Sequence, residues 1–248
     1  MKIVGIIPAR YASTRFPAKP LADIGGQSMI ERVYQQACKC QSLDRTIVAT
    51  DHERIYDHVK SKGIEVYMTA ANHTSGTDRC FEALALVNKK FDYVINIQGD
   101  EPFIAPEQID LLASLLHGGV ELATLKKKIQ DPADLQNSNT VKVITNSKNE
   151  AIYFSRSALP HLRNTPLHLW LTKHIYFKHI GLYAYRPDVL REIVNLPPSP
   201  LEKAESLEQL RWIENGYRIK LAETEQETIS IDTPEDLVRA LTHLKGIH

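Results

Sequence analysis

The sequence predicts an α/β protein built on a mostly parallel, twisted sheet flanked by helices. In its first half, short apolar runs alternate with segments of helical periodicity, the pattern of successive βαβ units. From about Glu121, strand-like runs follow one another with turns between them. We therefore expect one domain over residues 1–248, with a β-rich elaboration over roughly residues 130–220.

The composition is that of a globular, enzyme-sized protein. Its 248 residues are 43% hydrophobic, which is enough to fill a sizeable core. The 30 basic and 30 acidic residues cancel, so no overall field favours nucleic acid or an anionic membrane, and an anion site must be built locally. The three cysteines lack CxxC spacing, and neither a signal peptide nor a membrane-spanning stretch is recognisable, so we expect a cytoplasmic protein without membrane insertion.

The elements of the first half can be assigned in order. The apolar run Ile3–Ile7 predicts a buried strand. A helix is expected after Ser28, because Ser28 and Glu31 have the spacing of a capping box and apolar residues recur at helical spacing as far as Ala37. The elements expected next are a strand over 46–50, a helix ending near Gly63, a strand over 66–68, a helix carrying Phe81, Leu84 and Val87, and a strand over 93–98.

The second half reads differently. Strands are expected over 141–144 and 151–154, around a turn at 146–149. The segment Pro160–Lys173 is irregular and holds the exposed-looking residues Leu169, Trp170 and Leu171, which fit a lid and a partner contact equally well. Ser199, with Glu202 closing a capping box, predicts a helix to about Gly216, and a last strand ending at Ile231 is expected before a terminal helix.

The loop that follows the opening strand carries three basic residues, Arg10, Arg15 and Lys19. Backbone N–H groups and cationic side chains that converge at the end of a buried strand can hold a polyanion. The loop is neither GxxxxGK[ST] nor GxGxxG, which excludes the two commonest phosphate loops. A solvated basic edge is the alternative, and the position between prolines directly after a buried strand disfavours it.

Two carboxylates follow expected strands, Asp100 in the sequence Gln98–Pro102 and Asp232. In an open parallel sheet, ligands collect at the carboxyl ends of strands. Taken singly, Asp100 fits a plain turn and Asp232 fits the residue before a capped helix. Together with the basic loop they predict a polyphosphate site with Mg²⁺, which prefers a few carboxylate oxygens plus phosphate and water. Zinc-site and GxSxG spacings do not occur.

Several further polar residues are explained equally well as ordinary structure. The turn at Ser75 and Gly76 suits close approach of a ligand, but it is also typical of a helix cap. His179 and Tyr183 are four residues apart and share one face of an expected strand. The plain interpretation of Arg156 is an ion pair after a strand. The plain interpretation of Glu208 and Gln209 is a solvated helix face.

The stretches at residues 7–21 (IPARYASTRFPAKPL) and 98–102 (QGDEP) strongly resemble the 3-deoxy-manno-octulosonate (Kdo) cytidylyltransferases, or CMP-Kdo synthetases. The resemblance extends over essentially the whole chain, with matching stretches at 48–51, 75–79, 153–156, 179–183, 207–211 and 232–237. Residues 228–231 and 160–173 depart from the family pattern. The resemblance implies a Rossmann-like nucleotidyltransferase fold whose β-rich part serves substrate binding and dimerisation.

The resemblance also implies an activity. CTP and Kdo would give CMP-Kdo and pyrophosphate for lipopolysaccharide biosynthesis, with Mg²⁺, in a cytoplasmic homodimer. By matched position, the nucleotide would be bound by Ala9, Arg10, Arg15, Lys19, Ser75 and Gly76, with Arg10, Lys19 and Asp100 catalytic. The metal would be held by Asp100 and Asp232, and the sugar acid by Gln98, Arg156, His179, Tyr183, Glu208 and Gln209.

Two alternatives remain open at this stage. One is a cytidylyltransferase for another sugar acid, either an amino-substituted Kdo or sialic acid, because the pocket residues and not the phosphate loop choose the acid. The other is a non-catalytic nucleotide-binding protein of the same fold, since intact site residues do not establish turnover. The sequence indicates no general base and does not give the number of metal ions.

Overall fold

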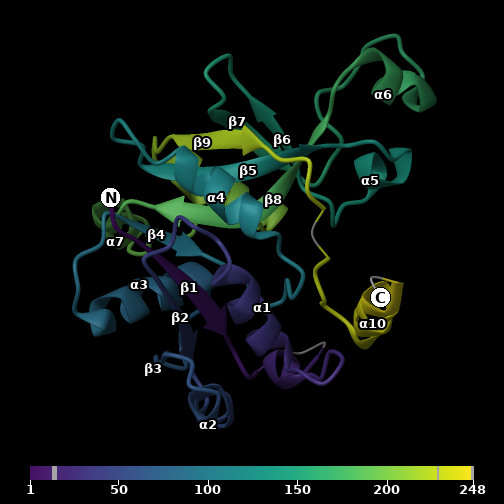
Figure 1. Cartoon of the computed structure of the whole chain (residues 1–248). Helices are drawn as coiled ribbons and strands as arrows, with labels where there is room; N and C mark the ends of the chain where they lie inside the picture. The colour runs from purple at the N-terminus through teal and green to yellow at the C-terminus, as the bar shows by residue number, and fades with distance from the viewer. Residues whose placement is uncertain (13–15, 228, 247–248) are drawn as a thin grey trace. The chain divides into compact units, whose positions relative to one another are not determined.

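The computed structural model describes residues 1–12, 16–227 and 229–246. The chain divides into two compact units (Figure 1). Unit 1 comprises Met1–Asp110 and Glu227–His248, and unit 2 comprises Leu111–Gln226. The single domain expected from the sequence stays a prediction. No helix in the described ranges has the length and apolar character needed to cross a bilayer.

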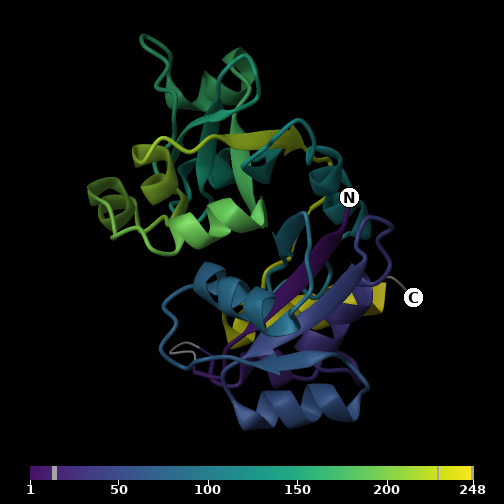
Figure 2. The same ribbon diagram turned by 90° about the vertical axis from the view of Figure 1, so that its left-hand side faces the viewer.

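Unit 1 is built on four parallel strands in the order β3-β2-β1-β4, which confirms the α/β class and the parallel sheet. Short apolar stretches form them, and the central strands are almost wholly buried, as expected for a sheet covered on both faces. Figure 2 shows the rotation from one strand to the next that is typical of open sheets. The strands are β1 (Ile3–Ala9), β2 (Arg45–Thr50), β3 (Val66–Met68) and β4 (Tyr93–Asn96).

Helices pack against this sheet. The capping box expected at the start of α1 is confirmed, because Ser28 Oγ accepts from the N–H of Glu31 and the Glu31 carboxylate accepts from the N–H of Ser28. Helix α4, which was not expected from the sequence, contains the boundary between the units. The helical elements are η1 (Lys19–Leu21), α1 (Met29–Ala37), α2 (Glu53–Ser61), α3 (Gly76–Val87), α4 (Pro106–Ser114) and α10 (Pro234–Gly246).

The C-terminal segment of unit 1 corrects one expectation. No strand ends at Ile231, since the last strand among the residues that the structure describes ends at Glu223. Ile231 is instead a buried residue of the segment before α10, and its N–H donates to the carbonyl of Asp100 at 2.9 Å. The Ile231 side chain packs in a small core with Ile24, Met29 and Ala240 of α10. Its burial therefore comes from this core and not from pairing in a sheet.

Unit 2 holds a mixed sheet in which β8 and β9 flank β5, and β6 pairs with both β7 and β8. β5 is antiparallel to β8 and parallel to β9. The long strand β8 runs directly into helix α7 (Figure 2). The strands are β5 (Leu122–Lys128), β6 (Lys142–Thr145), β7 (Ala151–Ser155), β8 (Phe177–Tyr185) and β9 (Ile219–Glu223). The helical elements are α5 (Pro132–Gln136), η2 (Leu167–Leu169), α6 (Trp170–Lys173), α7 (Pro187–Ile193), α8 (Pro200–Glu205) and α9 (Gln209–Glu214).

Two further expectations are wrong in unit 2. The helix expected from Ser199 to Gly216 is broken after α8, because Ser206 adopts the left-handed conformation with φ of 52°. The Arg211 guanidinium then ties α9 back to the Glu202 carboxylate of α8 at 2.6 Å. Trp170 is buried, not exposed: its ring stacks on Tyr176, and its indole N–H donates to the carbonyl of Thr165.

Candidate active site

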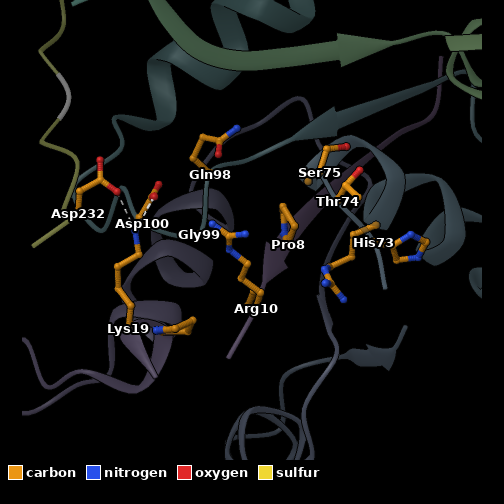
Figure 3. Close-up of a pocket in the computed structure, with 14 residues that line it drawn as sticks. Pro8, Arg10, Lys19, His73, Thr74, Ser75, Gln98, Gly99, Asp100 and Asp232 are labelled. Atoms are coloured by element: carbon orange, nitrogen blue, oxygen red, sulfur yellow. Dashed lines mark hydrogen bonds and ion pairs between the residues drawn. The ribbon is translucent and has the colours of Figure 1, made fainter. Parts of the chain in front are cut away.

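A cavity of about 300 Å³ opens in unit 1 where its parallel strands end (Figure 3). The end of β1, the start of η1, the N-terminus of α3, the segment after β4 and the segment before α10 all contribute to its wall. The structure thus brings together eight of the residues assigned by resemblance: Ala9, Arg10, Lys19, Ser75, Gly76, Gln98, Asp100 and Asp232. Arg15 lies outside the described residues.

Two carboxylates converge on one cation in this cavity. The ammonium of Lys19 lies 2.8 Å from Asp100 Oδ2 and 3.1 Å from Asp232 Oδ1 (Figure 3). The Lys19 side chain is 14% exposed, so these contacts are less screened than those of a surface pair. The hydrogen bond from Ile231 to the Asp100 carbonyl holds the two acidic segments side by side. Asp100 and Asp232, 132 positions apart in the sequence, therefore contact the same ammonium group.

Glu101 adds a third carboxyl group of different character. Its side chain is buried, and Oε2 has no hydrogen-bond partner among the described residues. Burial raises the pKa of Glu101 to about 8, with smaller contributions from the neighbouring charges of Asp100 and Asp232. Glu101 is therefore protonated at neutral pH and adds no negative charge to the cavity.

The donor set suits a divalent metal of the Mg²⁺ type. Asp100 and Asp232 supply hard oxygen atoms that already reach a common point, the Lys19 ammonium. The described part of the chain holds no group of three or more His, Cys, Asp and Glu side chains that could enclose a metal by themselves. Two carboxylates with open positions fit an ion that is completed by phosphate oxygens and water.

The opposite wall is the N-terminus of α3. Ser75 caps this helix, since its hydroxyl accepts from the N–H of Asp78 while the Asp78 carboxylate accepts from the N–H of Ser75. The cap leaves a helix N-terminus at the cavity, where backbone N–H groups and the helix dipole favour an anion or a polar edge. The nearby Gly99 allows close packing: a Cβ there would lie 2.6 Å from the carbonyl oxygen of Pro8.

Other cavity residues were not foreseen. Arg79, on α3, lines the cavity and forms an ion pair with Asp51 at 2.9 Å. Asp51 directly follows β2, so a polar residue at a strand end was a usable signal for it. His73 also lines the cavity and contacts the Glu82 carboxylate, and no sequence pattern distinguished it from an ordinary loop histidine.

The remaining assigned residues lie in unit 2. His179 and Tyr183 are neighbours on β8, with ring centroids 5.2 Å apart, which confirms that they share a face. Burial lowers the pKa of His179 to about 3, so the ring is neutral, and its Nε2 lies 3.1 Å from Thr124 Oγ1. The Tyr183 hydroxyl is buried without a hydrogen-bond partner among the described residues. Glu208 is the N-cap residue of α9, and Gln209, the first residue of the helix, is buried.

Arg156 has a different environment from the one expected of an anion-binding residue. Its guanidinium donates to the backbone carbonyls of Glu205 at 2.7 Å, Ser138 at 3.0 Å and Ser206 at 3.3 Å. These bonds fix the side chain against the turn that separates α8 from α9. The contact of Arg156 with a sugar acid stays a prediction.

Comparison with known proteins gives a consistent result. A family model described as cytidylyltransferase matches residues 4–223. The 3-deoxy-manno-octulosonate cytidylyltransferase of Cytophaga hutchinsonii is 57% identical over 244 residues, covering 98% of this chain and 97% of that protein. The protein of the same name from Parabacteroides distasonis is 54% identical over 249 residues, covering 98% of each.

Among solved structures, a CMP:2-keto-3-deoxy-manno-octonic acid synthetase complexed with CTP superposes with a TM-score of 0.92. It is 39% identical in sequence, and the match covers 100% of both chains. The family model and the full-length relatives agree on the same family. The chain belongs to the cytidylyltransferase family and, within it, to the 3-deoxy-manno-octulosonate cytidylyltransferases.

Proposed function

We propose that this protein transfers the cytidylyl group of CTP to Kdo, giving CMP-Kdo and pyrophosphate for lipopolysaccharide biosynthesis. The observation that carries the proposal is the meeting of Lys19 with Asp100 and Asp232 in a cavity that also holds Arg10 and a helix N-terminus. Such a site combines cations for a triphosphate with carboxylates for a divalent ion. Family membership supplies the nucleotide and the sugar acid.

The nucleotide is assigned to the unit 1 cavity. Arg10 and Lys19, with Arg15 by family resemblance, offset the charge of the triphosphate. Ala9, Ser75 and Gly76 border the nucleoside, where small side chains and the α3 backbone permit close approach. Asp100 and Asp232 would hold Mg²⁺, which supplies charge stabilisation at the phosphates when bound.

The reaction is an in-line displacement. The anomeric hydroxyl oxygen of Kdo forms a bond to the α-phosphorus of CTP, the bond from that phosphorus to the β-phosphate oxygen breaks, and the hydroxyl proton is released. Arg10 and Lys19 stabilise the charge that accumulates on the transferring and leaving groups. Positioning and electrostatics thus account for the chemistry assigned to this chain's residues.

The sugar acid is assigned to Gln98, Arg156, His179, Tyr183, Glu208 and Gln209 by family resemblance. The neutral His179 ring and the Tyr183 hydroxyl, which has no hydrogen-bond partner among the described residues, are suited to hydrogen bonds with sugar hydroxyls. Buried polar groups are normally hydrogen-bonded, and the ligand would supply the partners. We further propose a cytoplasmic homodimer, one domain over residues 1–248 with its β-rich elaboration at roughly 130–220, and Mg²⁺ as the metal.

Pyrophosphate release tests the function. Purified protein is incubated with Mg²⁺, each of the four nucleoside triphosphates, and Kdo, an amino-substituted Kdo or sialic acid. Release is expected with CTP and Kdo above all other pairs. Release with CTP and another acid would reassign the sugar, and no release with any pair would favour a non-catalytic nucleotide-binding protein.

A further inference from the structure

Tyr11, the second residue after β1, uses each of its polar groups in a contact. Its N–H donates to Asp51 Oδ1 at 3.1 Å, and its carbonyl accepts from the N–H of Ala18 at 3.0 Å. Its hydroxyl accepts from Arg54 Nη1 at 3.0 Å. Tyr11 therefore connects the start of the basic loop with Ala18, next to Lys19, and with the segment that follows β2.

The ring of Tyr11 is held as firmly as its backbone. It stacks on the ring of His52 with centroids 3.8 Å apart and planes 15° from parallel. The guanidinium carbon of Arg54 lies 5.9 Å from the Tyr11 centroid, within the range of a cation–π contact. His52 itself is fixed, because it caps α2 by accepting from the N–H of Arg54.

Asp51 links this arrangement to the opposite wall of the cavity. While Oδ1 accepts from Tyr11, Oδ2 forms the ion pair with Arg79 of α3. Arg79 also donates to Thr69 Oγ1 at 2.6 Å and is almost fully buried. One carboxylate thus connects the end of β1 with the helix whose N-terminus faces the cavity.

The position of Tyr11 gives these contacts a consequence for the reaction. Arg10 directly precedes Tyr11, and Lys19 directly follows Ala18, the residue bonded to the Tyr11 carbonyl. We propose that Tyr11, Asp51, His52 and Arg54 form a clamp that positions Arg10 and Lys19 for the triphosphate. The inference rests on the proposed function and assigns the clamp residues as positioning residues, not as contacts of the nucleotide.

The physical reason is preorganisation. Two cations brought to one site repel each other and lose conformational freedom, which costs binding free energy. If the clamp already holds them in place, this cost does not have to be met when CTP binds. If the clamp is loosened, only a fraction of molecules has both cations in place, and the apparent association constant for CTP falls to that fraction of its intrinsic value. Saturating CTP restores the arrangement, so the effect appears in KM and not in kcat.

The test uses His52→Asn, because asparagine retains a helix cap but removes the stacked ring. We expect the KM for CTP to rise about three- to tenfold, the range of an aromatic pair contact, while kcat changes less than about twofold. Tyr11→Phe removes only the hydroxyl contact with Arg54 and should raise KM about twofold. The control is Tyr56→Ala, which removes another aromatic ring of α2, one that lies 5.3 Å from the Lys60 ammonium and outside the clamp. This variant should leave the KM for CTP unchanged.

Titration of CTP binding by calorimetry, without sugar acid, accompanies the kinetics. A wild-type KM and wild-type CTP affinity in His52→Asn would overturn the inference, as would a fall in kcat at unchanged KM or an equal effect of Tyr56→Ala. If the wild-type protein binds CTP but releases no pyrophosphate with Kdo, the proposed function fails, and the binding titration still decides the clamp.

Discussion

Replacing Gly99 with alanine tests the packing that brings Asp100 to the cavity. The added Cβ would lie 2.6 Å from the carbonyl oxygen of Pro8, and ordinary contact begins at 3.4 Å. Because that oxygen belongs to the backbone of β1, a side-chain rotation cannot relieve the clash. The segment that carries Asp100 must move by about 0.8 Å relative to β1.

That displacement is large on the scale of a catalytic site, where about 1 Å can cost about 100-fold. We expect kcat/KM for pyrophosphate release to fall by about 10- to 100-fold in Gly99→Ala. Overpacking should also destabilise the fold by about 1–3 kcal/mol, which lowers the melting temperature by a few degrees per kcal/mol.

Gly76→Ala is the matched control. Its Cβ would meet the Pro8 ring at 3.3 Å, a milder approach to side-chain atoms in the same cavity, so its loss of thermal stability should be clearly smaller. Steady-state kinetics and thermal unfolding of both variants decide the matter. Wild-type kcat/KM and melting temperature in Gly99→Ala would refute the reasoning, as would an equal fall of the melting temperature in the two variants.

Three further sets of substitutions test the site and the fold. Lys19→Met preserves side-chain length but removes the charge, so turnover should fall about 100- to 1,000-fold in a chain that remains folded by circular dichroism; wild-type turnover contradicts its role. Asp100→Asn and Asp232→Asn should each raise the Mg²⁺ concentration for half-maximal activity by about tenfold or more, and an unshifted metal titration argues against the carboxylate pair. Burial raises the pKa of Glu31, but the hydrogen bonds with Ser28, Lys62 and His58 together outweigh it and lower the pKa from 4.5 to about 2. Glu31 thus contributes stability above about pH 4.5 that disappears as the pH falls towards 2, so Glu31→Gln should be less stable by about 1–2 kcal/mol at pH 7 and no less stable near pH 2, as measured by thermal unfolding.

Much of unit 1 could be predicted because its signals are local. A buried strand such as β1 is a continuous apolar run, and the capping box at Ser28 and Glu31 needs only a spacing of three residues. The convergence of Lys19 with Asp100 also followed, because β1 and β4 are parallel and end at one edge of the sheet. Asp232 joins them for a different reason from the expected one, since no strand of the described residues leads into it. What spacing could not give is the pairing itself, since Ile231 and Asp100 meet only through the path of the chain.

The failures have physical causes. Periodicity continues across Ser206, and a single residue in the left-handed conformation breaks the helix without changing the pattern. Trp170 looks exposed among irregular neighbours, yet it finds a stacking partner 5.9 Å away in Tyr176. The environment of Arg156 depends on backbone carbonyls of distant turns, which carry no side-chain signature.

The division of unit 1 into two separated stretches bears on how the protein is made. Lys19 and Asp100 emerge from the ribosome before unit 2, whereas Asp232 follows only after all of unit 2. A nascent chain therefore carries a basic loop and one carboxylate for as long as unit 2 is being synthesised. The cavity gains its second acid only once unit 2 has been synthesised, so a message cut short anywhere before that codon yields a chain lacking half of the proposed metal site.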